Sequence, residues 1–224
     1  SVRFGDRIEW NDPQLSRLWR YHLHYFDYCL ELAAWHHKTR DPRAFETLSA
    51  LIDSWIEQNS VVTGDGWHPF TVSLRTVNWI NAVSDFRTQL ERNRDFEELL
   101  VSSVVSQIRF IFKELEFDVG GNHLLKNLRA LIWAGVGFQG SEPDQWLNEG
   151  LQELQSQLEQ QVLADGGHFE RTPGYHCVVL RDCLEIAVWL RRNRVNVPRW
   201  LEVALNRMAQ YLKGILAPDS SVPI

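Results

Sequence analysis

Hydrophobic residues recur at three- and four-residue intervals along most of the chain, which is the spacing of one face of an α-helix. No segment shows the strict alternation of apolar and polar residues that is typical of a half-buried strand. The pattern predicts an all-α fold of about eight amphipathic helices. Because the links between them are short, we expect neighbouring helices to run antiparallel.

Proline, glycine and cap-forming residues delimit these helices. Asn11–Asp12–Pro13 and Asp41–Pro42 each combine a cap-forming side chain with a proline suited to a first helical turn. The expected ranges are Asn11 to about Lys38, Asp41 to about Gln58, Val72 to Val83, Asp95 to Glu116, Asn122 to about Ala134, Glu142 to Val162, Tyr175 to Arg192, and Pro198 to Ile215.

Every second link between consecutive helices contains two glycines. In an antiparallel array, these links should all lie at the same end of the helices. They are Gly64–Asp65–Gly66, Gly120–Gly121 and Gly166–Gly167. The residues after these links are evenly spaced, with 47 residues from Arg75 to Asn122 and 53 from Asn122 to Tyr175. A hairpin repeat of about 50 residues predicts helices that wrap into a solenoid or a toroid.

The segment from Asp165 to His176, DGGHFERTPGYH, holds the densest set of reactive side chains. Asp165–Gly166–Gly167 cannot continue a helix, and Pro173 suits the first turn of the next one. The segment is compatible with a solvated loop or with a functional site at a helix N-terminus. If the helical array curves, the side chains in and just after the glycine-containing links lie around a common cleft at one end. They are Trp67, His68, Arg75, Asn122, His123, His168, Arg171, Tyr175 and His176. Helix N-termini favour anions, so this end suits a carboxylate-bearing ligand.

Composition and charge narrow the choice of partner. The net charge of −6 argues against nucleic acid, because phosphate binding needs a basic surplus. No apolar run is long enough to span a membrane. Ten Trp residues fill a helical core or stack on sugar rings, and the core is the expected place for most of them.

Neither a metal nor another cofactor is expected. Cys29, Cys177 and Cys183 have no zinc or disulfide spacing, so we expect them to be buried as small hydrophobes. The paired histidines have no third ligand that the sequence identifies; they are His22, His24, His36 and His37. Ser1–Val2–Arg3 does not resemble the start of a signal peptide, and the compartment stays open: we expect a periplasmic or secreted protein if a signal was removed, and a cytoplasmic one otherwise.

Four segments resemble the heparinase II/III-like polysaccharide lyases. They are LWRYHLHYFDY (Leu18 to Tyr28), SLRTVNW (Ser73 to Trp79), GNHLLKN (Gly121 to Asn127) and DGGHFERTPGYH. The resemblance implies an incomplete α/α toroid and β-elimination on a uronate-containing polysaccharide, such as a glycosaminoglycan or alginate. It also implies that Asn122 and His123 bind the uronate carboxylate and that Tyr175 transfers a proton. The remaining residues of the predicted end would bind substrate.

Each site residue also has an ordinary structural alternative. Asn122 can cap a helix, Tyr175 can be a core ring with a tethered hydroxyl, and Arg75 can pair with a buried carboxylate. A tyrosine base, with a solution pKa of about 10, needs adjacent positive charge. Arg171, His176 or Arg75 would supply it.

Two features depart from the resembled pattern. Gly174 stands where a larger residue is expected before Tyr175. The family also carries a C-terminal β-sandwich with another catalytic His. We therefore expect a toroid domain over residues 1–217, a linker over residues 218–224 towards a missing sandwich, and weak or no activity of this chain alone.

Two other functions remain open. A glycoside hydrolase needs a pair of carboxyl groups, for which Asp65, Asp165 and Glu170 are candidates, although both aspartates lie in Asp-Gly pairs that suit turns. A non-catalytic glycan-binding or scaffold domain would keep the cleft without the chemistry.

Overall fold

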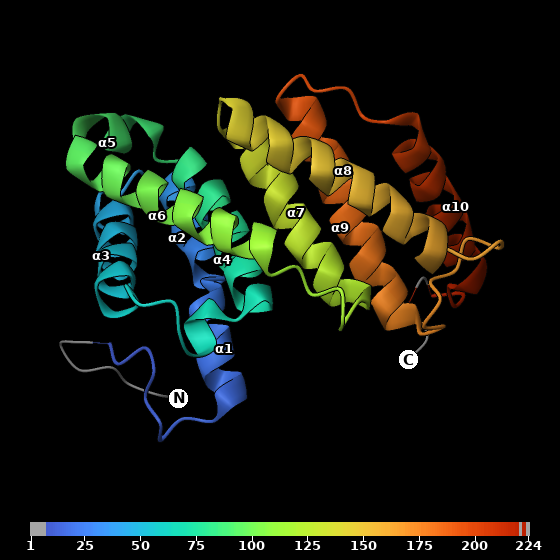
Figure 1. Ribbon diagram of the computed structural model, residues 1–224, viewed down its shortest axis with the longest axis horizontal. Helices are drawn as coiled ribbons and strands as arrows, with labels where there is room; N and C mark the ends of the chain where they lie inside the picture. The colour runs from blue at the N-terminus through green and yellow to red at the C-terminus, as the bar shows by residue number, and fades with distance from the viewer. Residues whose placement is uncertain (1–7, 220, 223–224) are drawn as a thin grey trace. The chain divides into compact units, whose positions relative to one another are not determined.

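The computed structural model describes residues 8–219, 221 and 222, and over these residues the fold is all-helical (Figure 1), as predicted. One isolated bridge, between Val162 and His168, is the β pairing found in the described residues. The helices are α1 (Arg17–Tyr25), α2 (Tyr28–Thr39), α3 (Arg43–Gln58), the 3-10 turn η1 (Asp65–Trp67), α4 (Pro69–Ser84), α5 (Arg87–Arg92), α6 (Arg94–Lys113), α7 (Gly121–Gly137), α8 (Ser141–Gln161), α9 (Pro173–Arg192) and α10 (Arg199–Ile215).

The helices form two compact units, one ending at Glu114 and the other beginning at Leu115. The first unit contains α1 to α6 and the second contains α7 to α10. Ser1–Arg3, Ser220, Pro223 and Ile224, on which the predictions about a signal peptide and a linker partly rest, lie outside the described residues.

The predicted first helix is two helices, and it begins later than expected. Asp12 forms a turn with the backbone N–H of Gln14, and α1 starts after Ser16, whose hydroxyl accepts a hydrogen bond from the Trp19 N–H. Phe26 then adopts a left-handed conformation at φ 59° and ends α1. Its ring is fully buried, so tertiary packing overrides the helical periodicity at this position.

A cluster of aromatic rings forms the core of the first unit. Phe26 stacks on Trp10 with ring centroids 5.0 Å apart and meets Trp79 edge-on at 5.1 Å. Trp55 contacts both Trp79 and Trp67. Six of the ten Trp residues of the chain are buried, which confirms the core as the place of most of them. The short helix α5 in this unit was not predicted.

In the second unit α7 is the central helix, and its residues from Leu124 to Gly135 are all buried. Helix α8 returns antiparallel along it, α9 packs on α7 in the same direction as α7, and α10 packs on α9 (Figure 1). The starts of α7 and α9 therefore lie at the same end of this unit, as the link pattern predicted. Cys183 is buried here and Cys29 in the first unit, as expected, whereas Cys177 is half-buried.

Candidate functional site

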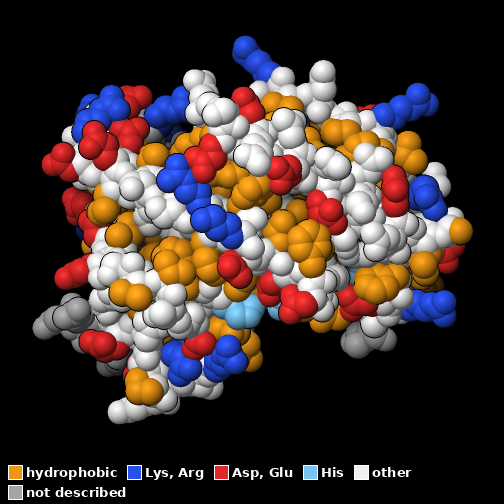
Figure 2. Space-filling model, viewed as in Figure 1, with side chains coloured by type: hydrophobic (Ala, Val, Ile, Leu, Met, Phe, Trp, Pro, Cys, Tyr) orange, Lys and Arg blue, Asp and Glu red, His pale blue; other side chains and the backbone are white. Residues whose placement is uncertain are grey.

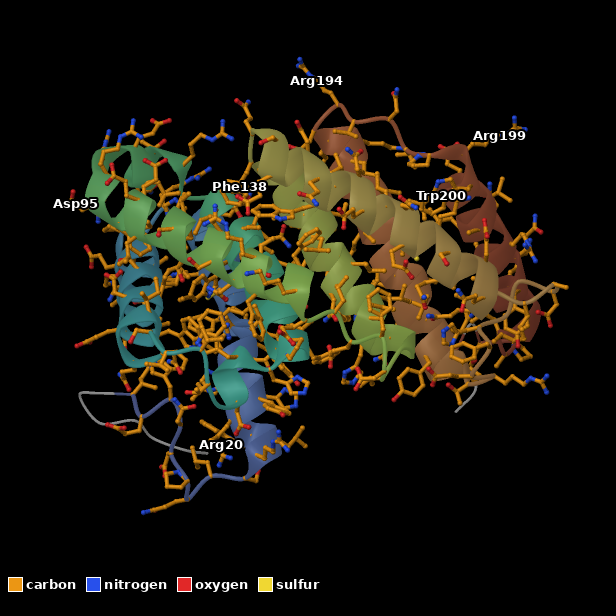
Figure 3. The ribbon with its side chains drawn as sticks, in the orientation of Figure 1. Arg20, Asp95, Phe138, Arg194, Arg199 and Trp200 are labelled. Carbon is orange, nitrogen blue, oxygen red and sulfur yellow. The ribbon has the colours of Figure 1, made fainter. Side chains whose placement is uncertain are left out.

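Hydrogen bonds of Asp65 and of the adjacent Trp67 hold the glycine link of the first unit. Asp65 accepts hydrogen bonds from Arg17 at 3.1 Å and from Arg20, which is labelled in Figure 3, at 2.7 Å. Burial raises the pKa of Asp65, but the two arginines outweigh it and the net pKa is lowered. The indole N–H of Trp67 donates to the Asn59 carbonyl at 2.8 Å. Asp65 and Trp67 therefore anchor this link to the unit.

Arg75 lies in the interior of the first unit, with no exposed surface. Its guanidinium donates to the Gly66 carbonyl at 2.9 Å and to Gln107 Oε1 at 2.8 Å, and it lies 3.8 Å from the centroid of the Trp55 ring. Burial lowers its pKa well below the usual arginine value. The placement gives Arg75 a role in holding the glycine link.

His68, the other predicted ligand in the first unit, is the N-cap residue of α4 and is half-buried. Its ring lies 5.4 Å from that of Tyr21. Of the three predicted site residues in this unit, His68 is the one with substantial exposed surface.

The second unit presents Asn122 and His123 in the first turn of α7, both half-buried. Gly120 and Gly121, at φ 64° and 52°, turn the chain into this helix. The His123 ring is anchored by Nδ1, which lies 3.1 Å from Glu116 Oε1. The His123 side chain is 35% exposed, whereas that of Glu116 is 6% exposed.

Two hydrogen bonds join Glu116 to Asn127. Its other carboxylate oxygen accepts from Asn127 Nδ2 at 3.0 Å, and its backbone N–H donates to Asn127 Oδ1 at 2.9 Å. Asn127 is fully buried, so this pair fixes the Glu116 side chain from the interior.

The first half of the Asp165–His176 segment is docked against the unit. Asp165 forms a turn by accepting the Gly167 N–H at 2.9 Å. A side chain added at Gly166, which has φ 90°, would collide with the backbone carbonyl of Arg207 on α10. His168 is buried and its Nε2 lies 3.2 Å from Gln161 Oε1; burial, with His176 nearby, lowers its pKa to about 4.

His176, at the other end of the segment, is also buried. Its Nε2 donates to the Met208 carbonyl at 3.0 Å. Burial lowers its pKa, although that hydrogen bond and Asp165 oppose the shift. The imidazole is therefore neutral near pH 7, and His176 does not supply the positive charge expected beside Tyr175. We assign His168 and His176 to holding the segment.

The middle of the segment is exposed. Tyr175, the third residue of α9, is 43% exposed, as is Phe169. Arg171 is exposed and left-handed at φ 55°. A side chain at Gly174 would meet no atom within 4 Å, so the glycine is not required by packing. Arg171 and Tyr175 are thus the predicted site residues of this segment that have exposed surface.

A buried ion pair holds α7 and α9 in register. Lys126 donates to Asp182 at 2.6 Å, and both side chains are at least nine-tenths buried. Burial lowers the pKa of Lys126 against the opposing effect of Asp182. Lys126 lies about one turn beyond Asn122, and Asp182 about two turns beyond Tyr175. The pair therefore fixes how the N-termini of α7 and α9, which carry the predicted catalytic residues, are positioned relative to each other along the helix axes.

The model of the Heparinase II/III N-terminus family matches residues 1–224. The chain belongs to this family. A heparin-sulfate lyase from Bacteroides stercoris is 26% identical over 251 residues, covering 100% of this chain and 37% of that protein. One from Pedobacter heparinus is 24% identical over 232 residues, covering 99% and 35%. The chain thus spans about a third of the length of these relatives.

Solved structures share its fold. A crystal structure of heparinase III aligns with a TM-score of 0.85 at 21% identity, covering 98% of this chain and 34% of that one. The heparan sulfate lyase HepC of Pedobacter heparinus aligns at 0.83 with 23% identity, covering 99% and 36%.

Sequence reasoning missed the residues that support this family's motifs. The helical pattern marks Glu116 only as the end of a helix, and it does not single out Lys126 or Asp182. A charged residue on the apolar face of a helical pattern is the signal that could have marked the last two, because such residues are seldom buried unless paired. Pairing across sequence distance is not visible in one sequence.

The described part of the chain contains neither a candidate metal cluster nor a membrane-spanning helix. Within residues 8–219, 221 and 222, no group of three His, Cys, Asp or Glu side chains could hold a metal ion. No helix among these residues is both long and apolar enough to cross a bilayer. On the face drawn in Figure 2, Lys and Arg are interspersed with Asp and Glu, so positive charge on this face is local.

Proposed function

We propose that this chain is the helical part of a polysaccharide lyase that cleaves a uronate-containing glycosaminoglycan by β-elimination. The observation that carries the proposal is the placement of Asn122, His123 and Tyr175 with exposed surface at the starts of two packed helices that run in the same direction. We favour a glycan of heparan sulfate type over alginate, because relatives covering the whole chain are named heparin-sulfate lyases.

In this proposal Asn122 and His123 bind the uronate carboxylate. Withdrawing electron density from the carboxylate acidifies the proton on the neighbouring ring carbon, which is the proton that β-elimination removes. The half-exposed Asn122 amide can donate a hydrogen bond, and the first turn of α7 adds unpaired backbone N–H groups.

Tyr175 is the proposed proton-transfer group. It removes the acidified ring proton or protonates the leaving glycosidic oxygen. Because His176 is neutral and Arg75 is buried in the other unit, Arg171 is the cation in this segment that we assign to favouring the tyrosinate. No metal takes part in the elimination step that we propose.

The contacts of the candidate carboxylates disfavour a hydrolase. Asp65 is paired with two arginines, and Asp165 accepts a backbone N–H within its own turn. Both have the turn-forming or anchoring role that their Asp-Gly pairs suggested. Asp165 and Glu170 are both exposed, but the Asp165 carboxylate is engaged in its own turn, whereas glycoside hydrolysis uses two available carboxyl groups across the scissile bond.

The test is incubation of the full-length natural protein with heparan sulfate, followed by ultraviolet absorbance and analysis of the fragment ends. β-Elimination leaves an unsaturated sugar that absorbs in the ultraviolet, so absorbance should rise with each cleavage. Fragments with only saturated ends would indicate a hydrolase. Binding of heparan sulfate oligosaccharides without any cleavage would support the non-catalytic glycan-binding alternative.

A further inference from the structure

A groove of about 480 Å³ lies between α8 and α10 on the second unit, away from Asn122 and Tyr175. Each helix lines it with residues at three-, four- or seven-residue spacing, which places them on one helical face. The lining side chains with the most to offer a ligand are Gln155 and Glu159 of α8, and Arg199, Trp200, Val203 and Arg207 of α10.

Trp200 is the feature that marks this groove as a binding surface. Six of the ten Trp residues are buried, and the half-buried rings of Trp35 and Trp189 are covered by Arg43 at 5.6 Å and by Trp133 at 5.1 Å. In the part of the chain that the structure describes, no aromatic ring or cation covers the half-buried Trp200 ring. The ring therefore suits a sugar, whose apolar C–H face packs on an aromatic face.

The segment that carries Trp200 is basic, although the chain as a whole is acidic. Residues 191–207 contain five Arg and one Glu, a formal charge of +4, whereas the whole chain has −6. Arg199 and Trp200 begin α10 and are labelled in Figure 3. Arg199 is exposed and has no hydrogen bond or ion pair to any of the described residues, so it is available to an anion.

The facing side of the groove is polar as well. Gln155 Nε2 donates to Glu159 Oε1 at 3.0 Å, and the carboxylate keeps further acceptor capacity for sugar hydroxyls. Val203, which is 48% exposed, adds apolar surface beside Trp200. Charged residues are depleted in the core of an interface between proteins, so this lining suits a charged sugar better than a second copy of the chain.

We propose that this groove is a second binding site, which takes an acidic oligosaccharide. Trp200 packs on a sugar ring, and Arg199 pairs with an anionic group of the same oligosaccharide. The choice of an acidic glycan rests on the proposed function, whereas the groove itself does not.

The groove leads toward the segment that carries Tyr175. Trp200 and Arg207 are about 10 Å apart along α10. Arg207 donates to the Leu163 carbonyl at 2.7 Å, at the start of the link into the Asp165–His176 segment. A glycan bound in the groove is therefore held on the unit that presents Tyr175.

The test is ¹⁹F NMR of the full-length natural protein labelled with fluorotryptophan, in a Tyr175→Phe background that slows the proposed cleavage. The probe is a heparan sulfate hexasaccharide, and the Trp200 and Trp35 signals are assigned by their loss in Trp200→Leu and Trp35→Leu. We expect the hexasaccharide to shift the Trp200 signal saturably. The Trp35 signal, from another half-buried Trp, should not move.

Charge recognition is tested with two arginine variants and a neutral ligand. Arg199→Gln should weaken the binding reported by Trp200 about threefold, the size expected for an exposed charge pair. Arg192→Gln is the matched control, because Arg192 is exposed on the same basic segment but does not line the groove, and it should have a smaller effect. A neutral cello-oligosaccharide should bind more weakly than the hexasaccharide.

Three results would overturn the inference. They are a Trp200 signal that the hexasaccharide does not shift, equal binding of the neutral oligosaccharide, and equal weakening by Arg199→Gln and Arg192→Gln. A Trp200 signal that moves with protein concentration in the absence of sugar would also overturn it, because the groove would then be a contact between copies of the chain.

Failure of the proposed function has a different signature. Asn122→Ala, with Tyr175 intact, should reduce cleavage of heparan sulfate while the Trp200 shift persists. If the wild-type protein cleaves no heparan sulfate and the hexasaccharide still shifts the Trp200 signal, the second site is supported and the proposed function is rejected.

Discussion

The two units use similar sequence motifs for different purposes. In the first unit Arg75 lies in the interior, where it donates hydrogen bonds to the Gly66 carbonyl and to Gln107 within an aromatic core. In the second unit the glycine links leave Asn122, His123 and Tyr175 with exposed surface. A motif that resembles a family signature can thus hold the scaffold in one place and leave polar side chains exposed in another.

The largest expected effect is the response of both units to acid. His24 in the first unit is buried, and burial with Arg75 nearby lowers its pKa to about 3; the pKa of His168 in the second unit is lowered to about 4. Since both folded-state values lie below the unfolded value of 6.5, the unfolded chain gains protons first as pH falls. The contribution of these two histidines to the free energy of unfolding should be fully present above pH 6.5. It should fall by roughly 3 kcal/mol per histidine by pH 4.

Urea unfolding between pH 7 and pH 4 measures this loss. His168→Gln keeps a polar group near Gln161. In this variant the slope of the unfolding free energy against pH should decrease by the equivalent of about one bound proton, while the part of the slope due to His24 persists. An unfolding free energy that stays constant from pH 7 to pH 4 would show that these rings are not buried in the neutral form.

Tyr175→Phe should have the next largest effect, and only on chemistry. Removing a proton-transfer group lowers turnover by about 10²–10⁴-fold. The ring is 43% exposed, so the free energy of unfolding should change by no more than about 0.5 kcal/mol. Initial rates from ultraviolet absorbance and thermal unfolding of the same preparations give both quantities.

Phe169→Leu is the control for Tyr175→Phe, because Phe169 is an equally exposed aromatic residue in the same segment. Its rate should stay close to that of the wild-type protein. A large loss of stability in Tyr175→Phe with little change in turnover would instead identify Tyr175 as a packing residue.

Arg75→Met should produce the reverse pattern. The variant leaves the Gly66 carbonyl and Gln107 without their donor in a buried site, which should cost about 2–4 kcal/mol of unfolding free energy. Arg171→Met, at an exposed position of the second unit, should cost no more than about 0.5 kcal/mol. Denaturant unfolding compares the two. If the Arg75→Met protein had normal stability but no longer bound oligosaccharide, Arg75 would be identified as a substrate-binding residue.

Much of the fold was determined by local sequence signals. The periodicity of apolar residues identified the long helices, and Pro69 and Pro173 stand in the first turns of α4 and α9, where a missing N–H costs nothing. The glycine pairs marked the links before α7 and α9. These features were predictable because helix periodicity and backbone conformation depend on neighbouring residues.

Only the tertiary structure decided which polar residues are buried. Phe26 breaks a regular helical pattern because its ring is enclosed by Trp10 and Trp79. Arg75 and His176 carry the same functional groups as exposed Arg171 and half-exposed His123, yet they lie in the interior. The pairings of Glu116 with His123 and of Lys126 with Asp182 join separate turns or helices. Burial and pairing depend on residues that are distant in the chain, so a single sequence names the reactive groups but does not determine their environment.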